Sequence, residues 1–185
     1  YNINSIGLNQ VDRSFQSNNP INQAGSIEVV NNGAKMFVTD RGANEIHQFS
    51  FGTNYDISTL TYDTVSFSTA GETGNPYNIE FYNGGNDFLL FHSQQAIYDY
   101  SLGSPYELTT VTLDDTHNVS FDDVDATPRW NDALFVDSGN AVYLAEQDRN
   151  AIAKFNLASP YALGGATPVG YFNIEQDGWN ISDID

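Results

Sequence analysis

The sequence predicts an all-β fold built from repeated four-stranded antiparallel sheets, and three observations lead to this prediction. Two separate sequence patterns each occur three times, with a period in the low fifties. Turns rich in asparagine and glycine separate short apolar or alternating segments, which is typical of β-hairpins. No stretch has the apolar i, i+3, i+4, i+7 spacing of an amphipathic helix.

The first pattern runs from an isoleucine to a little beyond a tyrosine. It reads IHQFSFGTNYDIS, IYDYSLGSPYELT and IAKFNLASPYALG, with the isoleucines at Ile46, Ile97 and Ile152. The tyrosines of this pattern are Tyr55, Tyr106 and Tyr161. We expect this repeated tyrosine to fill the gap between adjacent sheets rather than to stack against a ligand.

The second pattern is a glycine that precedes a short apolar segment. Gly33, Gly85 and Gly139 occupy this position and recur with nearly the same period as the tyrosines. A shared period in two independent patterns indicates a structural repeat. This period is too long for leucine-rich or ankyrin repeats and fits one four-stranded blade of a β-propeller.

Four strands can be placed in each repeat. The innermost strands are predicted at residues 26–30, 78–82 and 131–136, each followed by the asparagine- or glycine-rich turn. The apolar second strand follows, and a third strand then alternates with period two, as in 46–51. The outer strands are predicted at 60–67, at 111–121 with an interruption, and at 167–172.

These strands divide the chain into about three and a half blades within a single partial propeller. We assign residues 19–70, 71–126 and 127–174 to three full blades, residues 1–18 to the end of a preceding blade and 175–185 to the start of the next. A closed ring typically holds 4–8 blades. We expect the remaining blades to lie outside these 185 residues, and the alternative is that another copy supplies them.

Composition narrows the classes of partner. The chain has 24 acidic residues against 6 lysines and arginines, for a net charge of −18. A chain this acidic repels nucleic-acid phosphates and anionic membranes, so we expect no nucleic-acid partner. No run of 18 apolar residues is present, so we expect no membrane insertion. The absence of cysteine excludes disulfides and zinc–thiolate sites.

The repeat resembles a known family of bacterial and phage propellers. The resemblance rests on three segments of the first repeat: Gly33-Ala34-Lys35-Met36-Phe37-Val38, Ile46-His47-Gln48-Phe49-Ser50-Phe51 and Tyr55-Asp56-Ile57-Ser58-Thr59-Leu60-Thr61-Tyr62. They resemble the surface-layer and lactonase-like repeats of secreted bacterial proteins and phage structural proteins. The chain departs from that pattern where tyrosine replaces the usual tryptophan. The resemblance implies the fold and an extracellular, cell-surface or virion location, but not a function.

Two groups of residues are candidates for a metal site. An acidic segment contains Asp114, Asp115, Asp122, Asp123 and Asp125, with Asp132 nearby. Such oxygen ligands suit Ca²⁺, although a solvated loop between blades explains them as well. Seven residues after each repeated glycine stand Asp40, His92 and Glu146, which could also bind a metal or could be ordinary turn residues.

Three aromatic residues are candidates for ligand binding. Tyr77, Trp130 and Trp179 fall at the start of innermost strands, close to one mouth of a propeller. Sugars stack on such rings, although packing between blades would use them equally well. We assign no catalytic residue: His47 and His117 stand alone, and the sequence has no Gly-x-Ser-x-Gly elbow or phosphate-binding loop.

The residues therefore favour a non-enzymatic extracellular or virion-surface propeller, serving in adhesion or as a scaffold, with a protein or glycan partner. The first alternative is a lactonase- or glycosidase-like enzyme assisted by Ca²⁺, and the second is a carbohydrate-binding lectin. We expect no cofactor other than this possible Ca²⁺, and assembly into a larger complex is compatible with the open ring.

Overall fold

The computed structural model describes residues 20–72, 74–92, 96–120 and 128–173. This part of the chain is all-β, with three four-stranded antiparallel sheets and no α-helix, which confirms the predicted fold class. We call the sheets blades 1, 2 and 3 in chain order. The strands in each blade are hydrogen-bonded in the order in which they occur in the chain.

Blade 1 holds β1 (Ala24–Val30), β2 (Lys35–Asp40), β3 (Glu45–Phe51) and β4 (Leu60–Ser68). Blade 2 holds β5 (Pro76–Tyr82), β6 (Asp87–His92), β7 (Ile97–Leu102) and β8 (Val111–His117). Blade 3 holds β9 (Trp130–Val136), β10 (Ala141–Glu146), β11 (Ala151–Asn156) and β12 (Thr167–Asn173). Strand β8 ends at His117, earlier than the predicted end at residue 121. The half blades expected at both ends of the chain lie outside the described residues.

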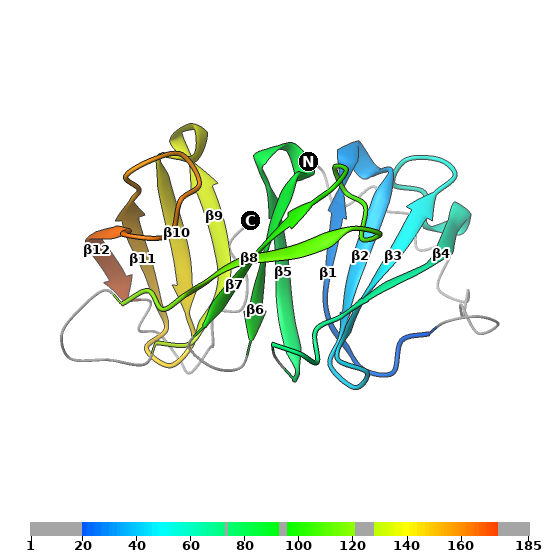
Figure 1. Cartoon of the computed structure of the whole chain (residues 1–185), viewed down its shortest axis with the longest axis horizontal. Helices are drawn as coiled ribbons and strands as arrows, with labels where there is room; N and C mark the ends of the chain where they lie inside the picture. The colour runs from blue at the N-terminus through cyan, green and yellow to red at the C-terminus, as the bar shows by residue number, and fades with distance from the viewer. Residues whose placement is uncertain (1–19, 73, 93–95, 121–127, 174–185) are drawn as a thin grey trace, which may run out of the picture.

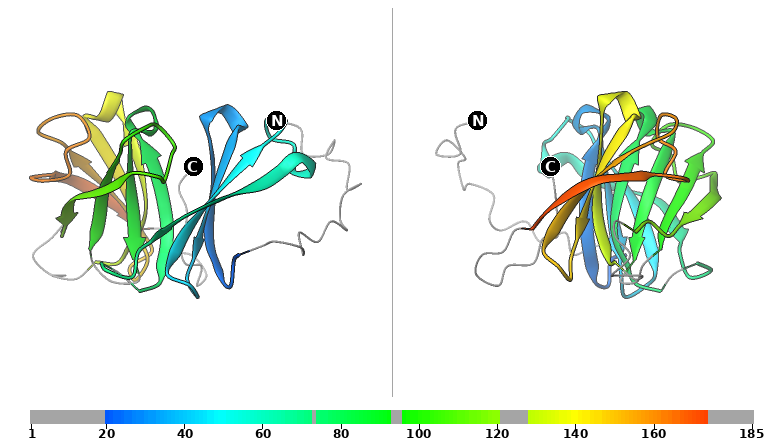
Figure 2. Two further views of the ribbon diagram at one scale, coloured as in Figure 1. Left: turned by 45° about the vertical axis from the view of Figure 1, so that its right-hand side comes forward. Right: turned by 90° about the vertical axis from the view of Figure 1, so that its left-hand side faces the viewer.

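The three blades stand side by side, with their first strands close together and their last strands pointing outward (Figures 1 and 2). Strand β1 lies next to β5, and β5 lies next to β9. The first strand of each blade is therefore innermost, as the sequence predicted. None of the described residues forms a helix that could cross a membrane.

A left-handed turn joins the first two strands of every blade. The short 3₁₀ turns are η2 (Asn31–Gly33), η4 (Asn83–Gly85) and η5 (Asp137–Gly139). All three residues of each turn have positive φ, and the closing glycines have φ of 80°, 82° and 86°. Asparagine, aspartate and glycine tolerate this region better than other residues do. The pattern used to place these hairpins in the sequence is thus the chemistry that the turn requires.

Each outer strand has a bulge opposite the third strand of its blade. The pairing shifts after Gln48 in blade 1, after Asp99 in blade 2 and after Lys154 in blade 3. The outer-strand residues left out of the pairing are Asp63 and Thr64, Asp114, and Val169. Bulges increase the local twist of a strand, and a repeated bulge gives all three outer strands the same kind of bend.

Two apolar clusters fill the two junctions between blades. Phe37 and Ile46 of blade 1 pack with Ile79, Phe81 and their neighbours in blade 2. Residues of blade 2 such as Leu89 and Ile97 pack in the same way with blade 3. Both faces of blade 2 are therefore buried, one against each neighbour.

A polar link accompanies the junction of blades 1 and 2. Lys35 and Gln48 of blade 1 both donate to the carboxylate of Glu107, at 2.5 and 3.0 Å. The Oε1 atom of Gln48 accepts from the backbone N–H of Leu108 at 2.9 Å. Burial raises the pKa of Glu107, but these donors outweigh it and the net shift is downward.

Candidate ligand-binding mouth

The N-terminal ends of β1, β5 and β9 lie at one end of the blade array. We call this end, together with the turns after β2 and β10, the mouth. The chains come close together here. A Cβ atom on Gly25 would lie 2.8 Å from the carbonyl oxygen of Pro76 and 2.6 Å from Oγ1 of Thr39. Only glycine therefore lets blade 1 approach blade 2 this closely at the mouth.

Tyr77, one of the predicted ligand-binding residues, lies at the mouth in contact with Arg41. The guanidinium carbon of Arg41 is 4.2 Å from the centre of the Tyr77 ring, and its Nη2 donates to the phenol oxygen at 3.1 Å. A guanidinium over an aromatic ring is a favourable cation–π contact. Because Arg41 belongs to blade 1, this contact joins two blades, which is the packing role that the sequence left open.

A second arginine, Arg129, stands just before β9 at the start of blade 3. Arg129 donates to both carboxylate oxygens of Asp148, and this hydrogen bond, the charge of Asp148 and the nearby Glu146 and Tyr77 raise its pKa. The side chains of the pair are 41% and 44% exposed. The mouth thus presents an accessible guanidinium whose present partner is a surface carboxylate.

The structure corrects the ligand-binding assignment of Trp130. Its side chain is 1% exposed, its indole N–H donates to the carbonyl of Val119 at 2.9 Å, and its ring lies edge-on to Phe155. A ring enclosed in this way has no free face for a sugar. Trp179, the third aromatic candidate, lies outside the described residues.

Asp40, His92 and Glu146 all hold the segment that leads into the innermost strand of their own blade. Asp40 accepts from the backbone N–H groups of residues 22, 23, 42 and 43. Glu146 accepts from those of residues 129, 148 and 149. His92 instead contacts the carbonyl oxygen of Gly74 through Nε2 at 2.5 Å. We call the repeat position that Asp40, His92 and Glu146 share the clamp position.

The metal assignments do not come together in the described part of the chain. No group of three or more histidine, aspartate or glutamate side chains there is arranged to hold a metal ion, so the clamp residues are not the metal site that the repeat register suggested. Asp114 and Asp115 are exposed on β8, where Asp114 accepts from Ser101. Asp122, Asp123 and Asp125 lie outside the described residues.

Side chains also connect the innermost strands across their edges. The carboxylate of Glu28 accepts from the backbone N–H of Phe81, at 3.1 and 3.2 Å. Nearer the mouth, the side-chain amide of Asn78 in β5 donates to Asp132 in β9 at 2.8 Å. Asp132 is 3% exposed, so this acid serves the junction of blades 2 and 3 rather than the acidic segment with which the sequence grouped it.

The two lone histidines of the sequence are buried beside carboxylates. Nε2 of His117 lies 3.3 Å from Asp99, whose other oxygen accepts from the Tyr82 hydroxyl at 2.5 Å. Burial, followed by the hydrogen bond and charge of Asp99, raises the pKa of Tyr82. His47 is 2% exposed and lies between Asp40 and Glu45. Both histidines lie on the third or fourth strand of their blade, not on an innermost strand.

Comparison with known proteins supports the fold. No protein-family model matches the chain, and no curated protein matches it. A functionally unknown protein from Desulfotomaculum acetoxidans matches with a TM-score of 0.55 and 18% identity, over 82% of this chain and 42% of its own.

Two further solved structures match equally well. One is described as a candidate 6-phosphogluconolactonase from Bacteroides fragilis (TM-score 0.55, 20% identity, 81% of this chain and 41% of that chain). The other is a periplasmic gluconolactonase from Pseudomonas aeruginosa (0.55, 15%, 82% and 41%). The chain spans about two fifths of the length of these structures. At this level of identity the likeness shows the fold alone, which is a partial β-propeller.

Sequence reasoning missed Arg41 and Arg129. The signal was present, because arginine is rare in so acidic a chain and Arg41 directly follows a clamp residue. The contact of Arg41 with a tyrosine of the next blade, however, depends on how the blades pack, and the repeat pattern does not encode that.

Proposed function

We propose that this chain is the ligand-binding part of an extracellular or virion-surface propeller, and that its mouth binds an acidic glycan. The observation that carries the proposal is the contact of Arg41 with Tyr77 at the mouth, together with the accessible Arg129 just before β9, in a chain with a net charge of −18. The two lysines, Lys35 and Lys154, lie elsewhere on their blades.

The chemistry of these three side chains suits a uronic acid or a similar sugar carboxylate. A guanidinium forms two parallel hydrogen bonds with a carboxylate, and an aromatic ring packs against the apolar face of a sugar. Arg129 already holds a carboxylate, that of Asp148, so a ligand carboxylate could replace it. The negative charge of the chain would weaken binding of an anionic ligand at low salt, so the guanidinium groups at the mouth have to supply the attraction.

The test is calorimetric titration of the protein with an oligosaccharide of galacturonic acid and with its methyl-esterified form. We expect the free acid to bind and the ester to bind at least ~10-fold more weakly, because the ester cannot pair with a guanidinium. Arg129→Gln should reduce the affinity for the acid by a similar factor. Tyr77→Ala should weaken binding of both forms, because it removes the stacking surface.

Lys35→Gln is the matched control. It removes one positive charge, as Arg129→Gln does, but Lys35 stands at the opposite end of β2 from the mouth. Its affinity should equal that of the wild type once circular dichroism has shown that the variant is folded. Equal binding of acid and ester, or equal losses in Arg129→Gln and Lys35→Gln, would refute an acidic-glycan site at the mouth.

A lactonase activity is the second candidate, and the names of two solved neighbours favour it. Its test is hydrolysis of gluconolactone, measured by titration of the released acid, with and without added Ca²⁺. Turnover above the spontaneous rate that Tyr77→Ala or Arg129→Gln abolishes would support an enzyme. Turnover unaffected by both changes would place no such activity at the mouth.

A further inference from the structure

Most of the large hydrophobic side chains exposed on the described part of the chain belong to the two outer blades, 1 and 3. Within the described part of the chain, nine such side chains are exposed: Ile27, Val29, Tyr55, Ile57, Leu113, Leu134, Val169, Tyr171 and Phe172. The first four belong to blade 1 and the last four to blade 3. Leu113 alone belongs to blade 2, which has a neighbour on each side.

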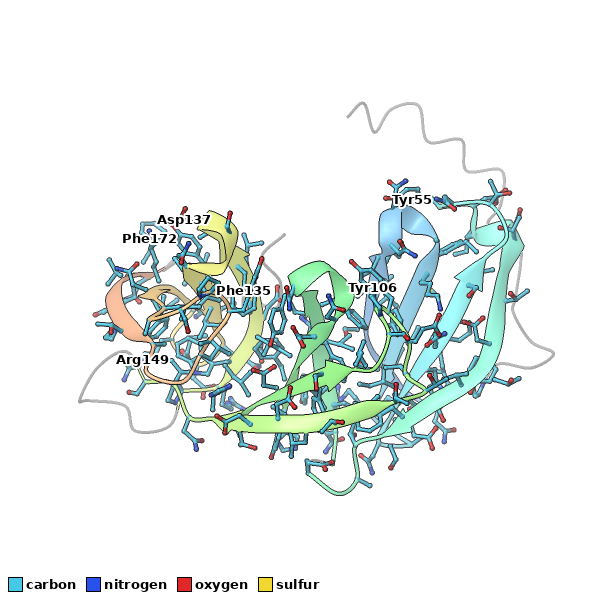
Figure 3. The ribbon with its side chains drawn as sticks, turned by 45° about the horizontal axis from the view of Figure 1, so that its top comes forward. Tyr55, Tyr106, Phe135, Asp137, Arg149 and Phe172 are labelled. Carbon is cyan, nitrogen blue, oxygen red and sulfur yellow. The ribbon has the colours of Figure 1, made fainter. Side chains whose placement is uncertain are left out.

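The four exposed residues of blade 1 are the repeat equivalents of residues that blade 2 buries against blade 1. Ile27 and Val29 are 65% and 39% exposed, whereas their equivalents Ile79 and Phe81 are 1% and 8% exposed. Tyr55 and Ile57 are 65% and 51% exposed, and their equivalents Tyr106 and Leu108 belong to or pack against the cluster at that junction. We call this side of blade 1 the front face (Figure 3 labels Tyr55 on it).

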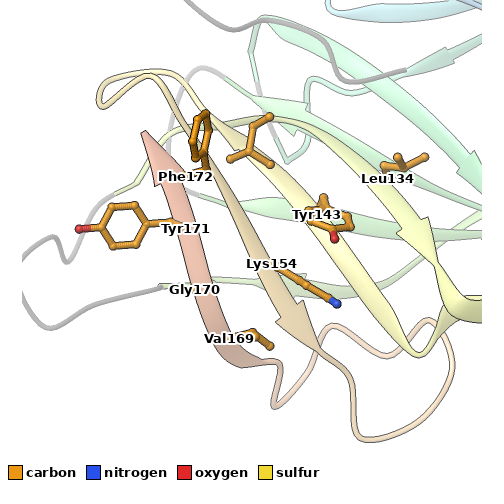
Figure 4. Close-up of a pocket in the computed structure, with 8 residues that line it drawn as sticks. Leu134, Tyr143, Lys154, Val169, Gly170, Tyr171 and Phe172 are labelled. Atoms are coloured by element: carbon orange, nitrogen blue, oxygen red, sulfur yellow. The ribbon is translucent and has the colours of Figure 1, made fainter. Parts of the chain in front are cut away.

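The opposite face of blade 3 carries the complementary set. Leu134, Tyr143, Ile152, Lys154, Val169, Gly170, Tyr171 and Phe172 line an open, largely apolar groove on it (Figure 4). Tyr143 and Ile152 are the equivalents of Phe37 and Ile46, which are 0% exposed because blade 2 covers them. We call this side of blade 3 the rear face.

The charges on the two faces also match. Lys154 on the rear face is the equivalent of Gln48, whose side chain reaches Glu107 of the following blade at 3.0 Å. The equivalent of Glu107 on the front face is Asp56. A blade 1 docked on the rear face would therefore bring a carboxylate opposite Lys154, at the position where the existing junction has an amide and a carboxylate.

We infer that the rear face of blade 3 binds the front face of blade 1 of a second copy of this chain. Both halves of the contact are on the same polypeptide, and both repeat the junctions already present between blades 1 and 2 and between blades 2 and 3. Such a head-to-tail contact closes into a ring when the rotation per subunit allows it. The chain matches about two fifths of the length of solved structures such as that from Desulfotomaculum acetoxidans, so two copies together would match most of the length of one of them.

The test is sedimentation equilibrium of the 185-residue protein over a wide concentration range. We expect association to about twice the 20.4 kDa of one chain. Ile27→Asp on the front face and Phe172→Asp on the rear face should each keep the protein monomeric. A ring of two copies has two identical contacts, and each substitution would bury a carboxylate in both of them. Both side chains are exposed in the single chain, at 65% and 69%, so both variants should fold. Leu113→Asp, which lies on neither face, is the matched control and should associate like the wild type.

Mixing the two variants gives a sharper result. The Ile27→Asp chain keeps an intact rear face and the Phe172→Asp chain keeps an intact front face, so the mixture should regain a heterodimer through one contact. A wild-type protein that stays monomeric would overturn the inference and would mean that further blades of a longer chain cover these faces. Association that neither substitution weakens would overturn it too, since it would use another surface.

Discussion

The repeated glycine and the repeated tyrosine that follows it form the same contact in all three blades. The tyrosine N–H donates to the glycine carbonyl at 2.8 or 2.9 Å, and the tyrosine itself has a positive φ of 57° to 64°. Its ring covers the glycine so closely that a Cβ atom there would lie 2.8 Å from ring carbons in blade 3, and closer still in the other two blades. Tyr161 also contacts Tyr82 of blade 2, with ring centres 5.4 Å apart, which confirms the predicted position of this tyrosine between blades.

We expect Gly85→Ala to destabilise the protein by at least about 2 kcal/mol, because it combines a left-handed backbone with a clash against the ring of Tyr106. Urea unfolding followed by tyrosine and tryptophan fluorescence measures this. Gly71→Ala is the control, because Gly71 has no atom within 4 Å of an added Cβ. Equal stability of the two variants would show that the ring can move aside.

The clamp position acts at the scale of the element, because it ties the segment before the first strand to the turn after the second. The repeat register located this position in the sequence, which left open whether it was a metal site or a set of ordinary turn residues. Each side chain is committed to backbone groups of its own blade, and the sequence does not show how close those groups come. The strands and hairpins, by contrast, were predictable because their turn chemistry is local.

Asp40 makes the clamp sensitive to pH. Burial raises the pKa of its carboxyl, but four backbone N–H donors outweigh this and lower it below 3.8. A group with a lowered folded pKa stabilises the protein above the unfolded value and loses that contribution as the pH falls through the folded value. We therefore expect Asp40→Asn to be less stable than the wild type at neutral pH, with the difference shrinking below pH 3.8.

Urea titrations of both proteins at a series of pH values measure this difference. Asp115→Asn is the control, because Asp115 is exposed on β8 and accepts from one backbone N–H. It should show little difference from the wild type at any pH. A constant gap between Asp40→Asn and the wild type down to low pH would mean that the Asp40 carboxylate does not provide the stabilisation.

At the scale of the whole molecule, the charge of −18 opposes compaction. We expect sodium chloride to raise the Tm progressively between low ionic strength and about 0.5 M, because screening weakens repulsion among exposed carboxylates. Differential scanning calorimetry measures this, with sucrose of equal osmolarity as the control. A Tm that rises equally in sucrose would attribute the effect to exclusion of solute rather than to charge.

The sequence was informative about blades and much less so about the mouth. The period, the turns and the strand at 46–51 were predicted from local patterns, and the structure confirms each of them. The alternation within β3 does not appear in its burial, because four consecutive residues of this strand are buried. The burial of Trp130 and the meeting of Arg41 with Tyr77 depend on contacts across blades, and a single repeat carries no record of its neighbours. Tyr77 lies near the start of an innermost strand, as predicted, and its described contact is with an arginine of the preceding blade; its binding of a ligand stays a prediction.

The clamp position also limits how the repeats could be shuffled by recombination or by protein engineering. Asp40 and Glu146 meet backbone N–H groups, whereas His92 meets the carbonyl oxygen of Gly74. A copy of blade 1 or blade 3 placed in the middle while keeping the existing linker would direct a carboxylate at that carbonyl. The three blades share an architecture, but they are not interchangeable, because each blade has to be transferred together with the linker that precedes it.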